Sequence, residues 1–198
     1  LGPNTVGFCI ADVSGKGVAA ALLMSNFQAM VRALFTAKVS LRSLVEDLNR
    51  RVCQNTSGEK FITFFIGRYN CLTGRLHYVN AGHLPPIVSS LGEVKELMSG
   101  SIGLGMLDEM PGVDVGCVRL RKGDLVVAYT DGLVEVDEGA TMGSNQDKVV
   151  EIMKKSMGID RTMGELASLA EATRAAGKSF DDTSVLAIEV TRAPLLPF

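Results

Sequence analysis

An apolar run, a single acid and a glycine-rich turn follow one another in Thr5-Val-Gly-Phe-Cys-Ile-Ala-Asp-Val-Ser-Gly-Lys-Gly-Val18. Apolar residues are nearly continuous over 5–13, and this pattern predicts a strand buried on both faces. The run ends on a single acid, Asp12, and a glycine-rich turn then leads directly into a helical pattern. A carboxylate at the end of a buried strand is held rigidly and is partly desolvated, so it can serve as a ligand for a hard cation.

Working outward, the hydrophobic periodicity predicts helices over 18–37, 41–55, 146–157 and 163–176. It predicts strands over 61–69, 76–80, 87–90, 93–97, 113–120, 125–130 and 181–190. Short turns join the six middle strands in pairs, which indicates three hairpins. Hairpins with segregated helix pairs favour an α+β fold, in which two antiparallel sheets form a sandwich with helices outside each sheet (α-β-β-α). We expect one domain over 1–192 and a tail over 193–198.

Composition narrows the classes of function. The chain has 198 residues, of which 46% are hydrophobic and 21% charged, as in a folded globular domain. A net charge of −2 gives no electrostatic case for binding nucleic acid or an anionic membrane. No apolar run is long enough to cross a bilayer, so we expect a cytoplasmic protein without membrane contact. The four cysteines lack C-x-x-C spacing and are expected to be buried free thiols rather than zinc ligands.

Two later acids also lie at strand ends, Asp131 in Tyr129-Thr-Asp-Gly132 and Asp181 in Phe180-Asp-Asp-Thr183. Each has a simpler interpretation, because Asp-Gly is typical of turns and an Asp pair is typical of a capped or solvated turn. Together with Asp12, they instead indicate a shared site for Mg²⁺ or Mn²⁺, which prefer carboxylate oxygens. Two such ions can activate water for attack on a phosphoryl group without a Ser, Cys or His nucleophile.

Other polar motifs are less informative. The Ser14-Gly-Lys-Gly17 turn lacks the spacing of a nucleotide phosphate loop, and Lys16 is expected to face solvent. His83 either donates a proton to a leaving group or orders the bend before Pro85-Pro86. Asp124, in Arg121-Lys-Gly-Asp124, is expected to be a turn residue.

Four motifs occur in order: Ala11-Asp-Val-Ser-Gly-Lys-Gly17, Asn80-Ala-Gly-His-Leu-Pro-Pro86, Tyr129-Thr-Asp-Gly-Leu133 and Phe180-Asp-Asp-Thr-Ser184. In this respect the chain strongly resembles the PPM-type (type 2C-like) metal-dependent serine/threonine phosphatases, in particular the bacterial sporulation and stress-response sigma-factor regulators. The resemblance implies the sandwich described above, two Mn²⁺ or Mg²⁺ ions, and hydrolysis of phosphoserine or phosphothreonine. It implies a phosphorylated signalling protein, such as an anti-sigma-factor antagonist, as substrate.

By the same resemblance, Asp12 bridges the two metals, the Val13 carbonyl binds one of them, and Asp131 and Asp181 hold the other. Asp182 is a neighbour rather than a ligand. Family members also carry an acidic strand before the first one found here. We therefore expect this chain to be a fragment that is poorly active alone; the alternative is an impaired phosphatase-like module that binds proteins. Exposed apolar residues in 100–112 or 18–37 could serve a homodimer.

Overall fold

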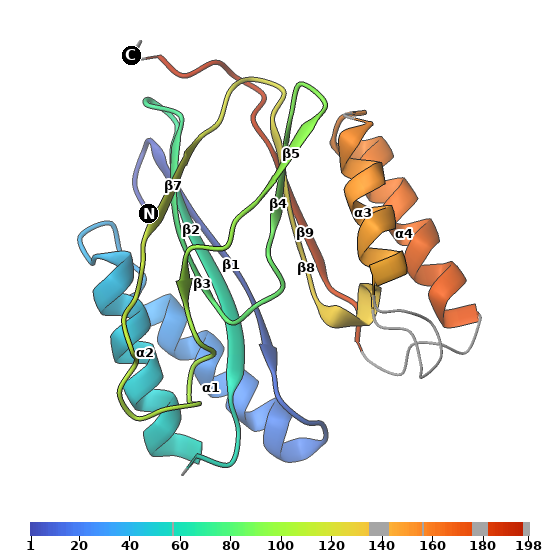
Figure 1. The fold of residues 1–198 in the computed structure, drawn as a ribbon. Helices are drawn as coiled ribbons and strands as arrows, with labels where there is room; N and C mark the ends of the chain where they lie inside the picture. The colour runs from blue at the N-terminus through green and yellow to red at the C-terminus, as the bar shows by residue number, and fades with distance from the viewer. Residues whose placement is uncertain (57, 135–142, 156, 176–181, 196–198) are drawn as a thin grey trace. The chain divides into compact units, whose positions relative to one another are not determined.

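The computed structural model describes residues 1–56, 58–134, 143–155, 157–175 and 182–195 (Figure 1). These residues form two compact units, each with its own sheet and its own pair of helices. Unit 1 comprises Leu1–His83, Met98–Arg119 and Pro194–Phe198, and unit 2 comprises Leu84–Leu97 and Leu120–Ala193. A single domain over 1–192 stays a prediction.

Unit 1 contains a five-stranded sheet in which β1, β2, β3 and β6 are neighbours in that order and β7 pairs with β3. The pairing is antiparallel except between β3 and β6, which are parallel. Two helices lie against one face of the sheet (Figure 1). The elements are β1 (Thr5–Val13), α1 (Val18–Leu34), α2 (Leu41–Thr56), β2 (Ile62–Asn70), β3 (Arg75–Ala81), β6 (Gly100–Ser101) and β7 (Gly116–Arg119).

The core of unit 1 lies between this sheet and its helices. Alternate residues of β2, Ile62, Phe64 and Ile66, point to the helices, and the ring of Phe27 in α1 packs edge-on against Phe64 at 5.0 Å between centroids. The second helix is capped by Ser40, whose hydroxyl accepts the Ser43 N–H at 3.0 Å.

Unit 2 contains a four-stranded antiparallel sheet in the order β5-β4-β8-β9. Its helices α3 and α4 contribute Val149, Ile152, Met153 and Leu166 to a core with the sheet residues Ile87, Leu125, Val127 and Tyr129. The Ser89 hydroxyl donates to the Met153 carbonyl at 2.7 Å and ties β4 to α3. The elements are β4 (Ile87–Ser90), β5 (Glu93–Glu96), β8 (Leu125–Tyr129), the 3-10 helix η1 (Asp131–Leu133), α3 (Gly143–Lys154), α4 (Ile159–Ala175) and β9 (Val185–Glu189).

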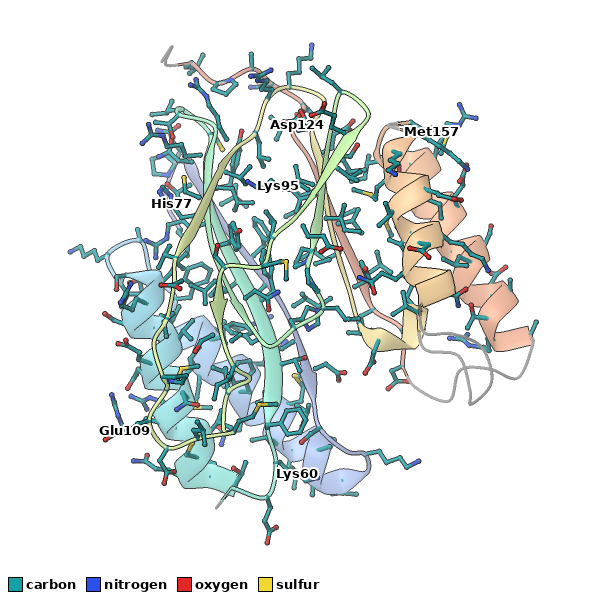
Figure 2. The ribbon with its side chains drawn as sticks, in the orientation of Figure 1. Lys60, His77, Lys95, Glu109, Asp124 and Met157 are labelled. Atoms are coloured by element: carbon teal, nitrogen blue, oxygen red, sulfur yellow. The ribbon has the colours of Figure 1, made fainter. Side chains whose placement is uncertain are left out.

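The predicted α+β class, with two mainly antiparallel sheets and two helix pairs, is confirmed. Two of the three predicted hairpins, β2–β3 and β4–β5, are also confirmed. The third is wrong, because β7 pairs with β3 in unit 1 whereas β8 pairs with β4 and β9 in unit 2. The turn before β8 is a turn as expected, with the Asp124 carboxylate accepting the Arg121 N–H at 2.8 Å (Figure 2). This turn is bonded to the residue that follows β9, because the Val190 N–H donates to the Asp124 carbonyl.

Two expectations about burial are wrong. In β1, Ile10 and Val13 are buried but Val6 is 48% exposed, and among the described residues β1 pairs only with β2. A continuous apolar run therefore marks a strand that is only partly covered in this structure.

The cysteines are free, as expected, but Cys9, Cys71 and Cys117 are exposed rather than buried. In the described residues, no helix is both long and apolar enough to cross a membrane.

Candidate metal centre

Asp12 lies near the end of β1, directly opposite Thr63 of β2, and is half-buried. Val13, Ile62 and Phe64 pack in the core between sheet and helices. Because side chains alternate along a strand, Asp12 and Thr63 both point to the face of the sheet away from α1 and α2. The sequence therefore holds an acid and a hydroxyl side by side on the face that the helices leave open.

The carbonyl of Val13 points away from β2. The backbone N–H groups of Cys71 and Ser14 donate to the carbonyls of Asn4 and Phe61, each at 2.9 Å, so the pairs 4–71 and 14–61 are hydrogen-bonded. In an antiparallel ladder such pairs alternate with non-hydrogen-bonded ones. By this alternation the Asp12–Thr63 pair is hydrogen-bonded through the backbone, whereas the Val13 carbonyl is directed to the other edge of β1. It is an oxygen donor that the β1–β2 ladder does not use.

The turn after Asp12 is fastened to the start of β2. The Ser14 hydroxyl accepts the Phe61 N–H at 2.9 Å, and the Lys60 ammonium donates to the Ser14 carbonyl at 3.4 Å (Figure 2). Gly15 and Gly17 have φ angles of 81° and 86°, which an L side chain rarely adopts. Lys16 is exposed, as expected. The turn thus fixes the end of the strand that carries Asp12 and Val13.

The second motif forms a bend whose geometry depends on Asn80. The Asn80 side chain accepts the His83 N–H at 2.8 Å and donates to the His83 carbonyl at 3.0 Å, and both residues are buried. The His83 ring reaches β2, with its Nδ1 at 3.0 Å from the Thr63 hydroxyl. His83 takes part in the bend through its backbone, which Asn80 binds, and its imidazole contacts the residue opposite Asp12. Its expected role as a proton donor to a leaving group stays a prediction.

In unit 2, Asp131 begins η1 directly after β8, and Thr130 ties this point to the chain just before β9. The Thr130 hydroxyl donates to the Asp182 carbonyl at 3.1 Å and accepts the Ser184 N–H at 2.9 Å. The Thr130 N–H donates to the Ser184 carbonyl at 3.0 Å. Ser184 is thus bonded through its backbone to Thr130, a residue distant in the sequence. Asp131 is half-buried and Asp182 is exposed.

The predicted ligands are distributed over both units. Asp12 and Val13 belong to unit 1 and Asp131 to unit 2, while Asp181 lies outside the described residues. Within the described ranges, no three His, Cys, Asp or Glu side chains form a group that could hold a metal ion. Convergence of the three acids therefore stays a prediction. The donors themselves, the half-buried carboxylates of Asp12 and Asp131 and a strand carbonyl that the β1–β2 ladder does not use, have the chemistry that Mg²⁺ or Mn²⁺ requires.

Sequence reasoning missed Thr63, Asn80 and Thr130. The Thr130 hydroxyl bonds to the backbone of Asp182 and Ser184, which are distant in the sequence, so neighbouring residue types give no signal for it. The role of Thr63 depends on strand register, which residue types alone do not reveal.

We expect Thr130→Val to lower the free energy of unfolding by about 2 kcal/mol, because two hydrogen bonds of about 1 kcal/mol each are lost. Thr130→Ser, which keeps the hydroxyl, should lose much less. Urea denaturation followed by circular dichroism measures both variants. A Val variant with the wild-type midpoint would show that the tie between β8 and the segment before β9 contributes nothing.

Comparison with known proteins identifies the family of this chain and several relatives. The family model of the stage II sporulation protein E (SpoIIE) matches residues 2–191. Phosphoserine phosphatase RsbU of Bacillus subtilis (strain 168) is 32% identical over 134 residues, which are 67% of this chain and 40% of RsbU. The chain thus spans less than half the length of that relative.

Solved structures agree with this match. The RsbU and RsbW domains of Rv1364c from Mycobacterium tuberculosis superimpose with a TM-score of 0.81 at 26% identity, over 96% of this chain and 54% of that one. RsbX in complex with magnesium has a TM-score of 0.68 at 18% identity, over 94% of this chain and 82% of that one, a likeness of fold alone.

Proposed function

The chain belongs to the SpoIIE family, and we propose that it is the catalytic part of a metal-dependent protein serine/threonine phosphatase. The single observation that carries the proposal is the family match over 2–191, which includes all four motifs with their acids. The relative RsbU is named a phosphoserine phosphatase. A phosphoric monoester on a serine or threonine side chain is therefore the proposed substrate group.

Asp12, the Val13 carbonyl, Asp131 and Asp181 would hold two Mn²⁺ or Mg²⁺ ions, with Asp12 bridging them. Support comes from the half-buried carboxylates of Asp12 and Asp131 and from the Val13 carbonyl directed away from β2. When bound, such ions supply activation of a water molecule and neutralisation of phosphoryl oxygens. The chain's own contribution is to fix the oxygen donors of Asp12, Val13 and Asp131 at the ends of hydrogen-bonded strands. RsbX is a relative in fold that has been crystallised with magnesium.

The proposed protein substrate is a phosphorylated signalling partner of the anti-sigma-factor antagonist type, which follows from the resemblance to sigma-factor regulators. The proposed setting is the cytoplasm, where such partners reside. A homodimer through the exposed apolar residues of α1, such as Val18 and Leu22, is compatible with their 77% and 66% exposure.

The test is release of phosphate from a phosphoserine peptide by the protein at its full natural length. We expect hydrolysis in the presence of Mn²⁺ or Mg²⁺ and loss of activity when EDTA removes the metal. Calorimetric titration with Mn²⁺ is performed in parallel on the same preparation. Binding without hydrolysis of any phosphopeptide would favour the impaired, protein-binding alternative, and absence of metal binding would refute the proposed function.

A further inference from the structure

We propose that His83 and Thr63 position the carboxylate of Asp12, with His83 donating from Nδ1 to the Thr63 hydroxyl and that hydroxyl donating to Asp12. The inference rests on the proposed function, because it assigns to these two residues the task of orienting a metal ligand. All three belong to unit 1, and they come from three segments of the chain: the end of β1, the start of β2 and the bend after β3.

The backbone that carries His83 is firmly held. Asn80 brackets it with two hydrogen bonds, and the neighbouring Gly82 donates its N–H to the Ser101 carbonyl at 3.0 Å. Gly82 has φ of 68°, and a Cβ there would lie 2.6 Å from the backbone nitrogen of Gly103. His83 is only 6% exposed. The imidazole therefore has a restricted position, which suits a residue that must orient another group.

Thr63 is the residue through which His83 can act on Asp12. Its hydroxyl lies 3.0 Å from His83 Nδ1. Thr63 is also directly opposite Asp12 in the β1–β2 register, so the two side chains share one face. Directly opposite residues in an antiparallel pair have Cβ atoms about 4.5–5.5 Å apart. The His83–Thr63 contact is present in the structure, and the hydrogen bond from Thr63 to Asp12 is the step that we infer.

The position of the proton on the His83 ring determines the direction in which the hydrogen bonds from His83 to Thr63 and from Thr63 to Asp12 can run. A threonine hydroxyl has one proton to donate and lone pairs that accept. If His83 carries its proton on Nδ1, the Thr63 oxygen accepts from the ring and its own proton is directed to the carboxylate opposite. If the proton is on Nε2, the hydroxyl donates to the ring instead and Thr63 has no proton left to donate to Asp12. The proposal therefore assigns the Nδ1–H tautomer to His83.

Hydrogen bonds of this kind matter for a metal site because they fix the orientation of the carboxylate that binds the ion. Loss of such an outer partner typically lowers metal affinity by about 10–100-fold. Asp12 is the acid proposed to bridge both ions, so a rotated carboxylate would weaken two metal positions at once.

The experiment measures the Kd for Mn²⁺ by calorimetry on Thr63→Val, Thr63→Ser, His83→Asn and His83→Gln. We expect Thr63→Val to raise Kd about 10–100-fold and Thr63→Ser to restore it. His83→Asn places an amide near the Nδ1 position and should retain more affinity than His83→Gln, whose amide lies near Nε2. Thr56→Val is the matched control, because the Thr56 hydroxyl donates to the Val52 carbonyl within α2, and its Kd should not change.

Melting temperatures of the metal-free variants show whether each remains folded. Unchanged Mn²⁺ affinity in folded Thr63→Val would overturn the inference. If Thr63→Val does not fold, equal affinities of His83→Asn and His83→Gln would overturn it instead. Asp12→Asn distinguishes failure of the positioning role from failure of the proposed function. Loss of Mn²⁺ binding in Asp12→Asn, with normal binding in Thr63→Val, refutes only the positioning role. Normal binding in Asp12→Asn refutes the proposed function itself.

Discussion

Asp12→Asn is expected to reduce phosphatase turnover on the order of 10³-fold. Charge stabilisation by bound metal is worth several kcal/mol in the transition state, and about 4 kcal/mol corresponds to that factor. Asn keeps the shape of Asp12 but removes the negative charge that a bridging ligand needs. The measurement is the initial rate of phosphate release from a phosphoserine peptide at saturating Mn²⁺.

The metal-free Asp12→Asn protein should remain folded. Carboxylates that are predicted to converge repel one another without a cation, so removing one relieves repulsion rather than a stabilising contact. Mn²⁺ should raise the melting temperature of the wild type but not that of the variant, because only a ligand that binds the folded state stabilises it.

Asp47→Asn is the control for loss of a carboxylate elsewhere in unit 1. Asp47 pairs with Arg50 and Arg51 on the surface of α2, and surface ion pairs contribute little. We expect wild-type turnover and wild-type metal response. If instead Asp12→Asn unfolds before metal is added, Asp12 is a structural acid and the metal proposal loses its central ligand.

Local patterns predicted the elements well because each depends on nearby residues. The strand over 5–13 has the predicted bounds, and the Ser40 cap and the β2–β3 and β4–β5 hairpins follow from turn and capping chemistry within a few residues. The first helix ends at Leu34 rather than at 37. A distant residue contributes here: the Arg68 guanidinium of β2 donates to the carbonyls of Thr36 and Val39 just beyond the helix.

Pairing between distant strands could not be predicted in the same way. The segments 116–119 and 125–129 are close in sequence and carry a turn between them, yet they join different sheets. The decisive contacts are with β3 and β9, and no local propensity encodes them. The same limit applies to the candidate site, since Asp12 was visible from its motif whereas Thr63 acquires significance only through the register that places it opposite.

Gly100→Ala is expected to lower the free energy of unfolding by about 3 kcal/mol, at the upper end of what overpacking costs. Gly100 lies in β6, beside Asn80 of β3. A Cβ at Gly100 would overlap the Asn80 carbonyl and would lie 2.6 Å from its backbone nitrogen. Because these atoms are backbone, no rotamer change can make room, and β6 would have to move away from β3.

The consequences should extend from β6 to the candidate site. Displacement of β6 strains the hydrogen bond from the Asn80 N–H to the Ser99 carbonyl, 2.9 Å long, and Asn80 is the residue that brackets His83. Gly164→Ala in α4 is the matched control: nothing lies within 4 Å of its Cβ, and Ala should stabilise that helix by about 0.5–1 kcal/mol. Urea denaturation measures the free energy of unfolding of both variants. Equal midpoints for Gly100→Ala and the wild type would mean that β6 can leave β3 without cost, and that the bend carrying His83 does not depend on it.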